Sequence, residues 1–145
     1  MFVLDVNILI YAFRRDLPRH EIYYRWLTAA LAGGRRVGVA TWVELTVLRI
    51  NTLPSLSDRC AEPQDVFAFL SALRMQVGYE VIEPGPEHLS ILQKLCQALN
   101  LRGNDVNDAF LAALALERGA TLVSADRGFK RFTDLQWLDP GDEPG

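Results

Sequence analysis

The sequence predicts an α/β fold in which a mostly parallel central sheet is flanked by helices. Two observations support this class: short apolar runs with no polar face recur along the chain, and segments with helical spacing separate them. Neighbouring parallel strands need such a crossover, because the chain must return along the sheet between them. With 145 residues, the chain can build one solid core. We expect a single domain over 1–139 and a frayed tail over 140–145.

The first half of the chain is predicted to contain two strands and three helices. The strands are continuous apolar runs, and the second helix shows an apolar stripe at helical spacing. Pro18 suits the first turn of that helix, because a proline there loses no helical hydrogen bond. A polar segment, 51–63, then predicts a long loop. In chain order we expect a strand at 2–4, helices at 7–13 and 18–32, a strand at 37–40 and a helix at 42–50.

The second half continues the alternation of helix and strand. The Pro84-Gly85-Pro86 segment separates a strand from a further helix, and Gly119 is suited to the left-handed end of an Ala-rich helix. An aromatic and basic turn follows the next strand. In chain order we expect a helix at 64–75, a strand at 79–82, a helix after residue 86, a helix at 105–118, a strand at 120–124, a turn at 127–132 and a strand at 135–138.

Four acids stand where strands end or helices begin. Asp5 ends the first strand, Glu44 follows the strand at 37–40, Asp108 heads the Ala-rich helix and Asp126 follows the strand at 120–124. The carboxyl ends of parallel strands meet at one edge of the sheet, where ligands bind in open α/β folds. Two charges about 4 Å apart repel by roughly 4 kcal/mol at an effective dielectric of 20. Clustering of the four carboxylates therefore predicts a bound cation.

Each acid also has a structural explanation when it is taken singly. Asp5 can cap the helix that follows it, and Glu44 completes a capping box with Thr41. Asp108 can complement a helix dipole, and Asp126 can close a turn. The cluster is favoured because all four positions are expected on the same edge of one sheet.

Composition restricts the class of protein. No apolar run reaches the roughly 20 residues that a membrane span needs, and we expect no secretory signal, because Asp5 falls where its apolar region would lie. Cys60 and Cys96 form neither a zinc pattern nor a disulfide framework, so we expect a cytoplasmic protein. The net charge of −3 argues against a broad basic face for nucleic acid. Three basic residues just after Asp126 are candidates for binding phosphate, with a solvated turn as the alternative: Arg127, Lys130 and Arg131.

At these positions the sequence resembles the PIN-domain ribonucleases, and within them the VapC toxins of prokaryotic toxin-antitoxin pairs. The resemblance rests on Leu4-Asp5-Val6-Asn7-Ile8, Glu44, Asn107-Asp108-Ala109-Phe110 and Ser124-Ala125-Asp126-Arg127-Gly128. It implies a PIN-like three-layer fold and an endoribonuclease that hydrolyses RNA phosphodiester bonds. The implied catalytic and metal-binding acids are Asp5, Glu44, Asp108 and Asp126, with Asn7 and Ser124 as polar neighbours. One departure is Gly128, where many members carry a second acid.

The resemblance also implies a cofactor and partners. Carboxylate oxygens suit Mg²⁺, for which Mn²⁺ can substitute. The implied partners are an RNA substrate, a cognate antitoxin protein and a second copy in a homodimer, with no membrane. Four aromatic side chains on the helices could offer apolar surface to the antitoxin or to a second copy, although we expect most of them to be buried in the core: Tyr23, Tyr24, Trp26 and Trp42.

Three other classes of protein share part of this pattern. A PIN-like module that binds a partner without catalysis would not need all four acids. A haloacid-dehalogenase-like phosphatase also begins from an Asp at a strand end, but it requires a second acid where Asn7 stands. A response-regulator receiver would show an adjacent acid pair and a late-strand Lys, which this sequence lacks.

Overall fold

The computed structural model describes residues 1–54 and 59–142, and within them it has one five-stranded sheet. Every strand pair is parallel, which confirms the predicted fold class. The order across the sheet is β3-β2-β1-β4-β5. The strands are β1 (Phe2–Leu4), β2 (Val37–Ala40), β3 (Tyr79–Ile82), β4 (Thr121–Val123) and β5 (Trp137–Leu138).

The strand order reverses at the centre of the sheet. From β1 the chain builds outward through β2 to β3, and it then crosses to the other side of β1 to form β4 and β5. Ligands of open α/β sheets bind outside the carboxyl ends of the strands at such a reversal. The register pairs Leu4 with Val123, so Asp5 and Ser124 are the next residues on the two central strands.

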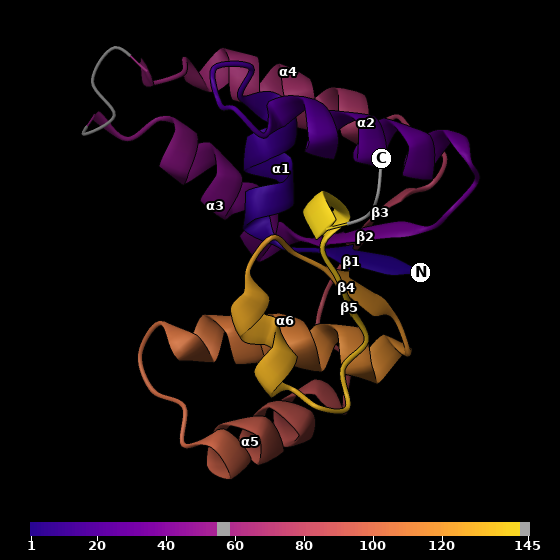
Figure 1. The fold of residues 1–145 in the computed structure, drawn as a ribbon, viewed down its shortest axis with the longest axis vertical. Coiled ribbons are helices and arrows are strands. Elements are labelled where there is room, and N and C mark those ends of the chain that lie inside the picture. Colours follow the sequence, from indigo (N-terminus) through magenta and orange to yellow (C-terminus); the bar gives the residue numbers. More distant parts are fainter. Residues whose placement is uncertain (55–58, 143–145) are drawn as a thin grey trace.

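Helices cover both faces of the sheet, which gives the expected three layers (Figure 1). One layer contains α1 to α4, and the other contains α5 and α6. None of the described helices is both long and apolar enough to cross a bilayer. The helices are α1 (Val6–Phe13), α2 (His20–Ala32), α3 (Thr41–Asn51), α4 (Pro63–Arg74), α5 (His88–Leu99) and α6 (Asp105–Arg118), with short 3-10 helices η2 (Arg127–Arg131) and η3 (Pro140–Asp142).

The Ala-rich helix α6 packs directly on the central strands β1 and β4. Ala109, Ala112 and Ala113 are fully buried, as are Val3 and Leu4. Small side chains allow a helix to approach a sheet closely, so the first turn of α6 comes near the carboxyl ends of β1 and β4. The predicted stop is confirmed, because Gly119 caps α6 with φ of 62°.

The start of α2 differs from the expectation. The helix begins at His20, and Pro18 lies in a turn before it. In this turn the Leu17 amide donates to the Arg14 carbonyl, and the His20 amide donates to the Leu17 carbonyl. The Leu17 and His20 amides are therefore bonded within this turn. Pro18 belongs to the turn, and the helix begins two residues after it.

The end of the chain also differs from the expected frayed tail. Residues 140–142 form η3, which packs against α2, and 143–145 lie outside the described residues, as do 55–58 of the predicted loop. The buried Asp139 carboxylate accepts a hydrogen bond of 2.8 Å from the Tyr23 hydroxyl, and a second from the Gly141 amide at 2.8 Å. These bonds hold the segment on the α1–α4 layer.

Most of the aromatic side chains that were considered for a partner surface are used inside the fold. Tyr23 is fully buried and stacks on Tyr11. Trp26 contacts Phe2, and Trp42 contacts Phe110. Tyr24 differs, because 48% of it is exposed.

Candidate active site

Asp5 is fixed at the carboxyl end of β1. Its amide donates to the Val123 carbonyl on β4 at 2.9 Å, which ties the end of one central strand to the other. Its Oδ1 accepts the Val6 amide at 2.7 Å, so the expected helix cap is present. Burial raises the pKa of the Asp5 carboxyl, hydrogen bonds from Ser124 and Val6 oppose the rise, and the charge of Asp126 adds to it. The capping role and a place in an acidic cluster therefore coexist.

Asn7 and Ser124 hold the second oxygen of Asp5. The fully buried Ser124 hydroxyl donates to Asp5 Oδ2 at 2.7 Å, and Asn7 Nδ2 donates to the same oxygen at 3.2 Å. The Asn7 amide also joins the two strand ends, since Nδ2 donates to Ser124 Oγ at 3.1 Å and Oδ1 accepts the Ala125 amide at 3.1 Å. Both predicted polar neighbours therefore contact Asp5 directly.

Asp126 lies beside this network and closes the turn after β4. Its amide donates to Ser124 Oγ at 2.9 Å, and its Oδ1 accepts the Gly128 amide at 2.8 Å. A Cβ atom on Gly128 would come within 3.0 Å of that same oxygen. The glycine therefore allows the turn to close tightly on Asp126, where many PIN-domain ribonucleases carry a further acid.

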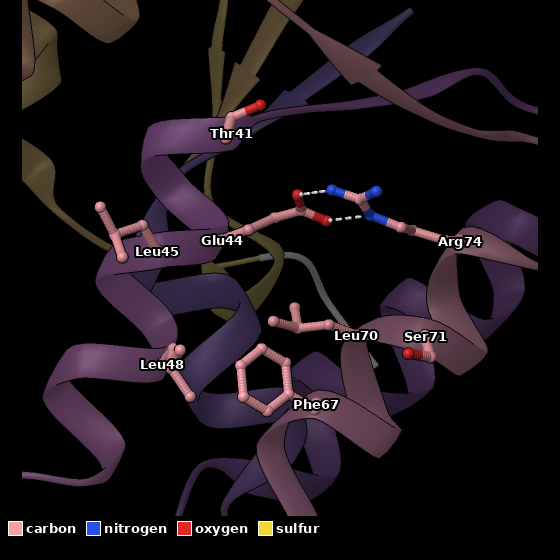
Figure 2. A pocket seen from close by; sticks show the side chains of 8 residues that line it. All are labelled: Thr41, Glu44, Leu45, Leu48, Phe67, Leu70, Ser71 and Arg74. Atoms are coloured by element: carbon pink, nitrogen blue, oxygen red, sulfur yellow. Dashed lines mark hydrogen bonds and ion pairs between the residues drawn. The ribbon is translucent and has the colours of Figure 1, made fainter. Parts of the chain in front are cut away.

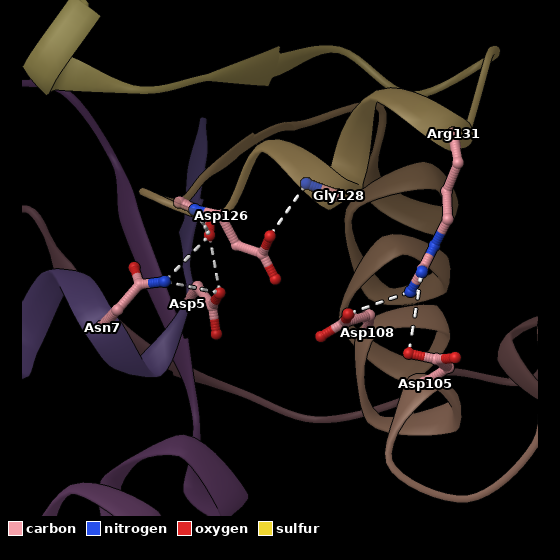
Figure 3. A network of polar contacts seen from close by, with 8 residues as sticks. Asp5, Asn7, Asp105, Asp108, Asp126, Gly128 and Arg131 are labelled. Atoms are coloured by element: carbon pink, nitrogen blue, oxygen red, sulfur yellow. Dashed lines mark hydrogen bonds and ion pairs between the residues drawn. The ribbon is translucent and has the colours of Figure 1, made fainter.

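Asp108 faces Asp5 and Asp126 from the first turn of α6 (Figure 3). Burial, followed by the charges of Asp5 and Asp126, raises the pKa of Asp108 to about 6. The rise therefore has two kinds of cause, which are the burial of Asp108 and the nearby charges of Asp5 and Asp126. The structure thus brings together three of the four predicted acids, from the carboxyl ends of β1 and β4 and the start of α6.

Arg131 contributes the positive charge next to Asp108. Its Nη2 lies 3.0 Å from Asp108 Oδ2, and its Nη1 lies 3.6 Å from Asp105 Oδ1. The other two candidate phosphate ligands lie on the same turn but have different neighbours. Arg127 pairs with Asp142 at 3.0 Å, and Lys130 Nζ lies 5.6 Å from the centre of the Trp137 ring.

In the described part of the chain, Glu44 makes no hydrogen bond to this network and is paired with Arg74 instead (Figure 2). Its carboxylate is 7% exposed and accepts two hydrogen bonds from Arg74 of α4, one of 3.0 Å from Nε and one of 2.5 Å from Nη2. The Tyr79 hydroxyl donates to Oε2 at 2.9 Å. The capping box with Thr41 does not form, because the cap of α3 is Ala40 and makes no side-chain hydrogen bond.

An apolar groove adjoins the Glu44–Arg74 pair. It lies between α3 and α4 and encloses about 390 Å³ (Figure 2). Leu45 and Phe67 on its walls are 59% and 54% exposed.

Sequence reasoning missed Arg74 and Tyr79 as partners of Glu44. The only available signal was charge, which does not identify a partner 30 residues away.

The donor set at the edge of the sheet suits a hard divalent cation. It consists of carboxylate oxygens, and the charges of Asp5 and Asp126 add to the effect of burial in raising the pKa of Asp108. Within 1–54 and 59–142, there is no group of three Asp, Glu, His or Cys side chains that converges closely enough to hold a metal ion. Mg²⁺ does not require one, because it commonly takes one or two carboxylates and keeps several waters.

Comparison with known proteins identifies the family of this chain. The family described as PIN domain matches residues 2–135. Ribonuclease VapC25 of Mycobacterium tuberculosis is 35% identical over 140 residues, which cover 97% of this chain and 99% of that protein. VapC ribonuclease Mb2897 of Mycobacterium bovis is 36% identical over 142 residues, which cover 98% of this chain and 97% of that protein.

Solved structures share the fold at lower sequence identity. VapBC2 from Rickettsia felis, bound to a DNA fragment from its promoter, aligns with a TM-score of 0.73 at 21% identity, covering 95% of this chain and 97% of that one. VapC20 of Mycobacterium tuberculosis, a toxin that cleaves the sarcin-ricin loop, aligns with a TM-score of 0.68 at 15% identity, covering 91% and 95%.

Proposed function

This chain belongs to the PIN domain family, and from that membership we propose that it is a metal-dependent endoribonuclease acting as the toxin of a toxin-antitoxin pair. The observation that carries the proposal is the crowding of Asp5, Asp108 and Asp126 where the strand order reverses. The ribonuclease names of relatives about 35% identical over nearly the whole chain support the choice of RNA as substrate.

Asp5 and Asp108 are the proposed direct ligands of a Mg²⁺ ion, for which Mn²⁺ can substitute, and Asp126 would bind it directly or through water. When bound, such an ion supplies Lewis-acid stabilisation of phosphoryl oxygens and makes water a better nucleophile at neutral pH. Ser124 and Asn7 keep Asp5 in one orientation by donating to the same oxygen. Fixed orientation matters because an in-line displacement at phosphorus tolerates little misplacement of the groups that hold it.

We assign Glu44 an indirect role. Both of its oxygens are engaged by Arg74, and Oε2 also accepts the Tyr79 hydroxyl. The pair joins the first turn of α3 to the end of α4, and through Tyr79 to β3. Glu44 therefore holds α3, α4 and β3 together. It would bind a cation at the site only through a water molecule, or after Arg74 releases it.

We further propose that the protein is cytoplasmic and that its protein partners are an antitoxin and a second copy of this chain. The apolar groove between α3 and α4 supports a protein partner, because Leu45 and Phe67 expose apolar surface beside it. The relatives in solved VapBC complexes favour an antitoxin as one partner. Expression of the chain alone should arrest bacterial growth, and co-expression of its neighbouring open reading frame should restore it.

The decisive experiment is RNA cleavage with purified protein. We expect new RNA ends in Mg²⁺ or Mn²⁺, none in EDTA, and cleavage at background for Asp5→Asn, which removes a charge with little change of volume. Asp134→Asn is the matched control, because Asp134 is an exposed acid outside the site. Cleavage that persists in EDTA and in Asp5→Asn would overturn the metal-nuclease proposal, and a folded wild type that never cleaves RNA would favour a PIN-like binding module.

A further inference from the structure

Arg131 has the contacts of an ion-pair partner that can exchange. It ends η2, directly across from the first turn of α6, and its side chain is 30% exposed. One hydrogen bond joins Nη2 to Asp108 Oδ2, while Nη1 is 3.6 Å from Asp105, beyond hydrogen-bond distance. Its Nε is buried and has no hydrogen-bond partner among the described residues. A guanidinium has five N–H donors, so most of the donors of Arg131 make no hydrogen bond within the described residues.

Asp108 depends on Arg131 for charge compensation. Arg131 is the cation that acts on this carboxylate, against the charges of Asp5, Asp126 and Asp105. The hydrogen bond occupies Oδ2, and Figure 3 shows the other oxygen of Asp108 on the side toward Asp5 and Asp126. In the protein without metal, the guanidinium thus takes part of the role that a divalent cation would fill.

We propose that Arg131 is exchanged between two anions: it holds Asp108 while no divalent cation is bound, and it binds an RNA phosphate once a cation takes that carboxylate. The inference rests on the proposed function and deepens it by naming a substrate contact. A cation on Asp108 adds positive charge beside the guanidinium and withdraws negative charge from it, so both effects weaken the ion pair. The released fork of donors matches a phosphate, which Arg binds in bidentate fashion.

The proposal predicts that removing Arg131 increases the affinity of the protein for a divalent cation. If Arg131 only oriented Asp108, its loss would weaken cation binding. If Arg131 competes for Asp108, its loss should strengthen cation binding. We expect Arg131→Gln to bind Mn²⁺ about fivefold more tightly than wild type, the ratio that about 1 kcal/mol of a partly exposed ion pair gives. Arg131→Lys keeps the charge, so its Mn²⁺ affinity should stay within about twofold of wild type.

The matched control lies on the same short helix. Arg127 also forms an ion pair of 3.0 Å, but its partner is the exposed Asp142 rather than an acid of the site. Arg127→Gln removes the same charge from the same turn without freeing an acid of the site, so it should change Mn²⁺ affinity less than Arg131→Gln does. Circular dichroism and thermal melts of all variants would establish that each one is folded before titration.

Two measurements test the exchange. Mn²⁺ binding without RNA is read from the electron paramagnetic resonance signal of the free ion, at pH 7.5. RNA affinity is then read from the fluorescence anisotropy of a labelled single-stranded RNA in Ca²⁺ across a salt series, with gels to verify that the RNA stays intact. We expect Arg131→Gln to bind RNA more weakly and to lower the salt slope by about 0.7, the value for one phosphate contact on a single strand.

The outcomes separate this inference from the proposed function. Mn²⁺ affinity in Arg131→Gln that equals or falls below that of Arg127→Gln overturns the exchange, while a wild type that binds Mn²⁺ and cuts RNA leaves the nuclease proposal intact. An unchanged salt slope in Arg131→Gln overturns the phosphate contact. A wild type that binds no Mn²⁺ overturns both the exchange and the proposed metal site.

Discussion

Replacing Asp108 by Asn should stabilise the protein in the absence of metal. At neutral pH the fold keeps Asp108 ionised beside Asp5 and Asp126, although its pKa has risen from 3.8 to about 6. A rise of that size costs the fold at most about 3 kcal/mol, at about 1.4 kcal/mol for each pKa unit. Since the side chain is 26% exposed, solvent screening reduces this to about 1–2 kcal/mol. The ion pair with Arg131 is already included in this figure, because Arg131 lowers the pKa of Asp108, so we expect a net gain of about 1 kcal/mol, at the lower end of the range.

The dependence on pH gives this prediction its signature. A carboxyl with a raised pKa in the folded state binds its proton more tightly there, so its ionisation destabilises the fold as pH rises from about 4 to about 6. The penalty is complete above that range. Asp108→Asn should therefore melt about 2–4 °C higher than wild type at pH 7.5 in EDTA, and the difference should vanish near pH 4.

Thermal melts of wild type, Asp108→Asn and the control Asp134→Asn would provide the test, in EDTA and in Mg²⁺. At 100 times its dissociation constant, Mg²⁺ should add about 2.7 kcal/mol to the wild type and much less to Asp108→Asn. A variant that melts below wild type at pH 7.5 in EDTA would refute the reasoning. So would a gain of stability that is the same at pH 4 and pH 7.5.

Two further changes test the contacts around the site. Ser124→Ala should lower the free energy of unfolding, measured in urea, by about 1–3 kcal/mol, because it leaves buried partners of the Ser124 hydroxyl unpaired. The control Ser71→Ala, on the exposed face of α4, should change this free energy little. Equal urea midpoints for the two variants would contradict the prediction. Arg74→Gln should lower the free energy of unfolding by about 1–2 kcal/mol, which is less than for a fully buried ion pair because Arg74 is 54% exposed. The control Arg36→Gln breaks an exposed pair with Glu80 and should lower it by under about 1 kcal/mol. A loss for Arg36→Gln as large as that for Arg74→Gln would show that burial of Glu44 does not matter.

The strands and the central part of the site were predictable because their signals are local. An apolar run followed at once by Asp5, or by Ser124 and Asp126, predicts both a buried strand and the group at its end. The parallel topology then places those groups together, since β1 and β4 are neighbours in register. Asp108 was predictable for a related reason, because small residues on α6 indicate close packing on the same strands.

The environment of Glu44 could not be read in the same way. Its partners come from the end of α4 and the start of β3, and neither Arg74 nor Tyr79 carries a pattern that identifies Glu44. The position of Arg131 was also only partly predictable: the basic turn was recognised, but its three basic side chains take three different directions. The beginning of α2 was misplaced because turn hydrogen bonds before His20 outweighed the preference of proline for a first helical turn.

The site joins parts of the chain that a ribosome makes at very different times. Ser124 lies 119 residues after Asp5, to which it donates a hydrogen bond. At roughly 5–20 residues per second, that interval lasts on the order of 6–24 s for each molecule. The groove between α3 and α4 is complete by residue 74, well before Asp108 and Asp126 are synthesised. The side chains that line the groove are therefore synthesised roughly 2–7 s before Asp108.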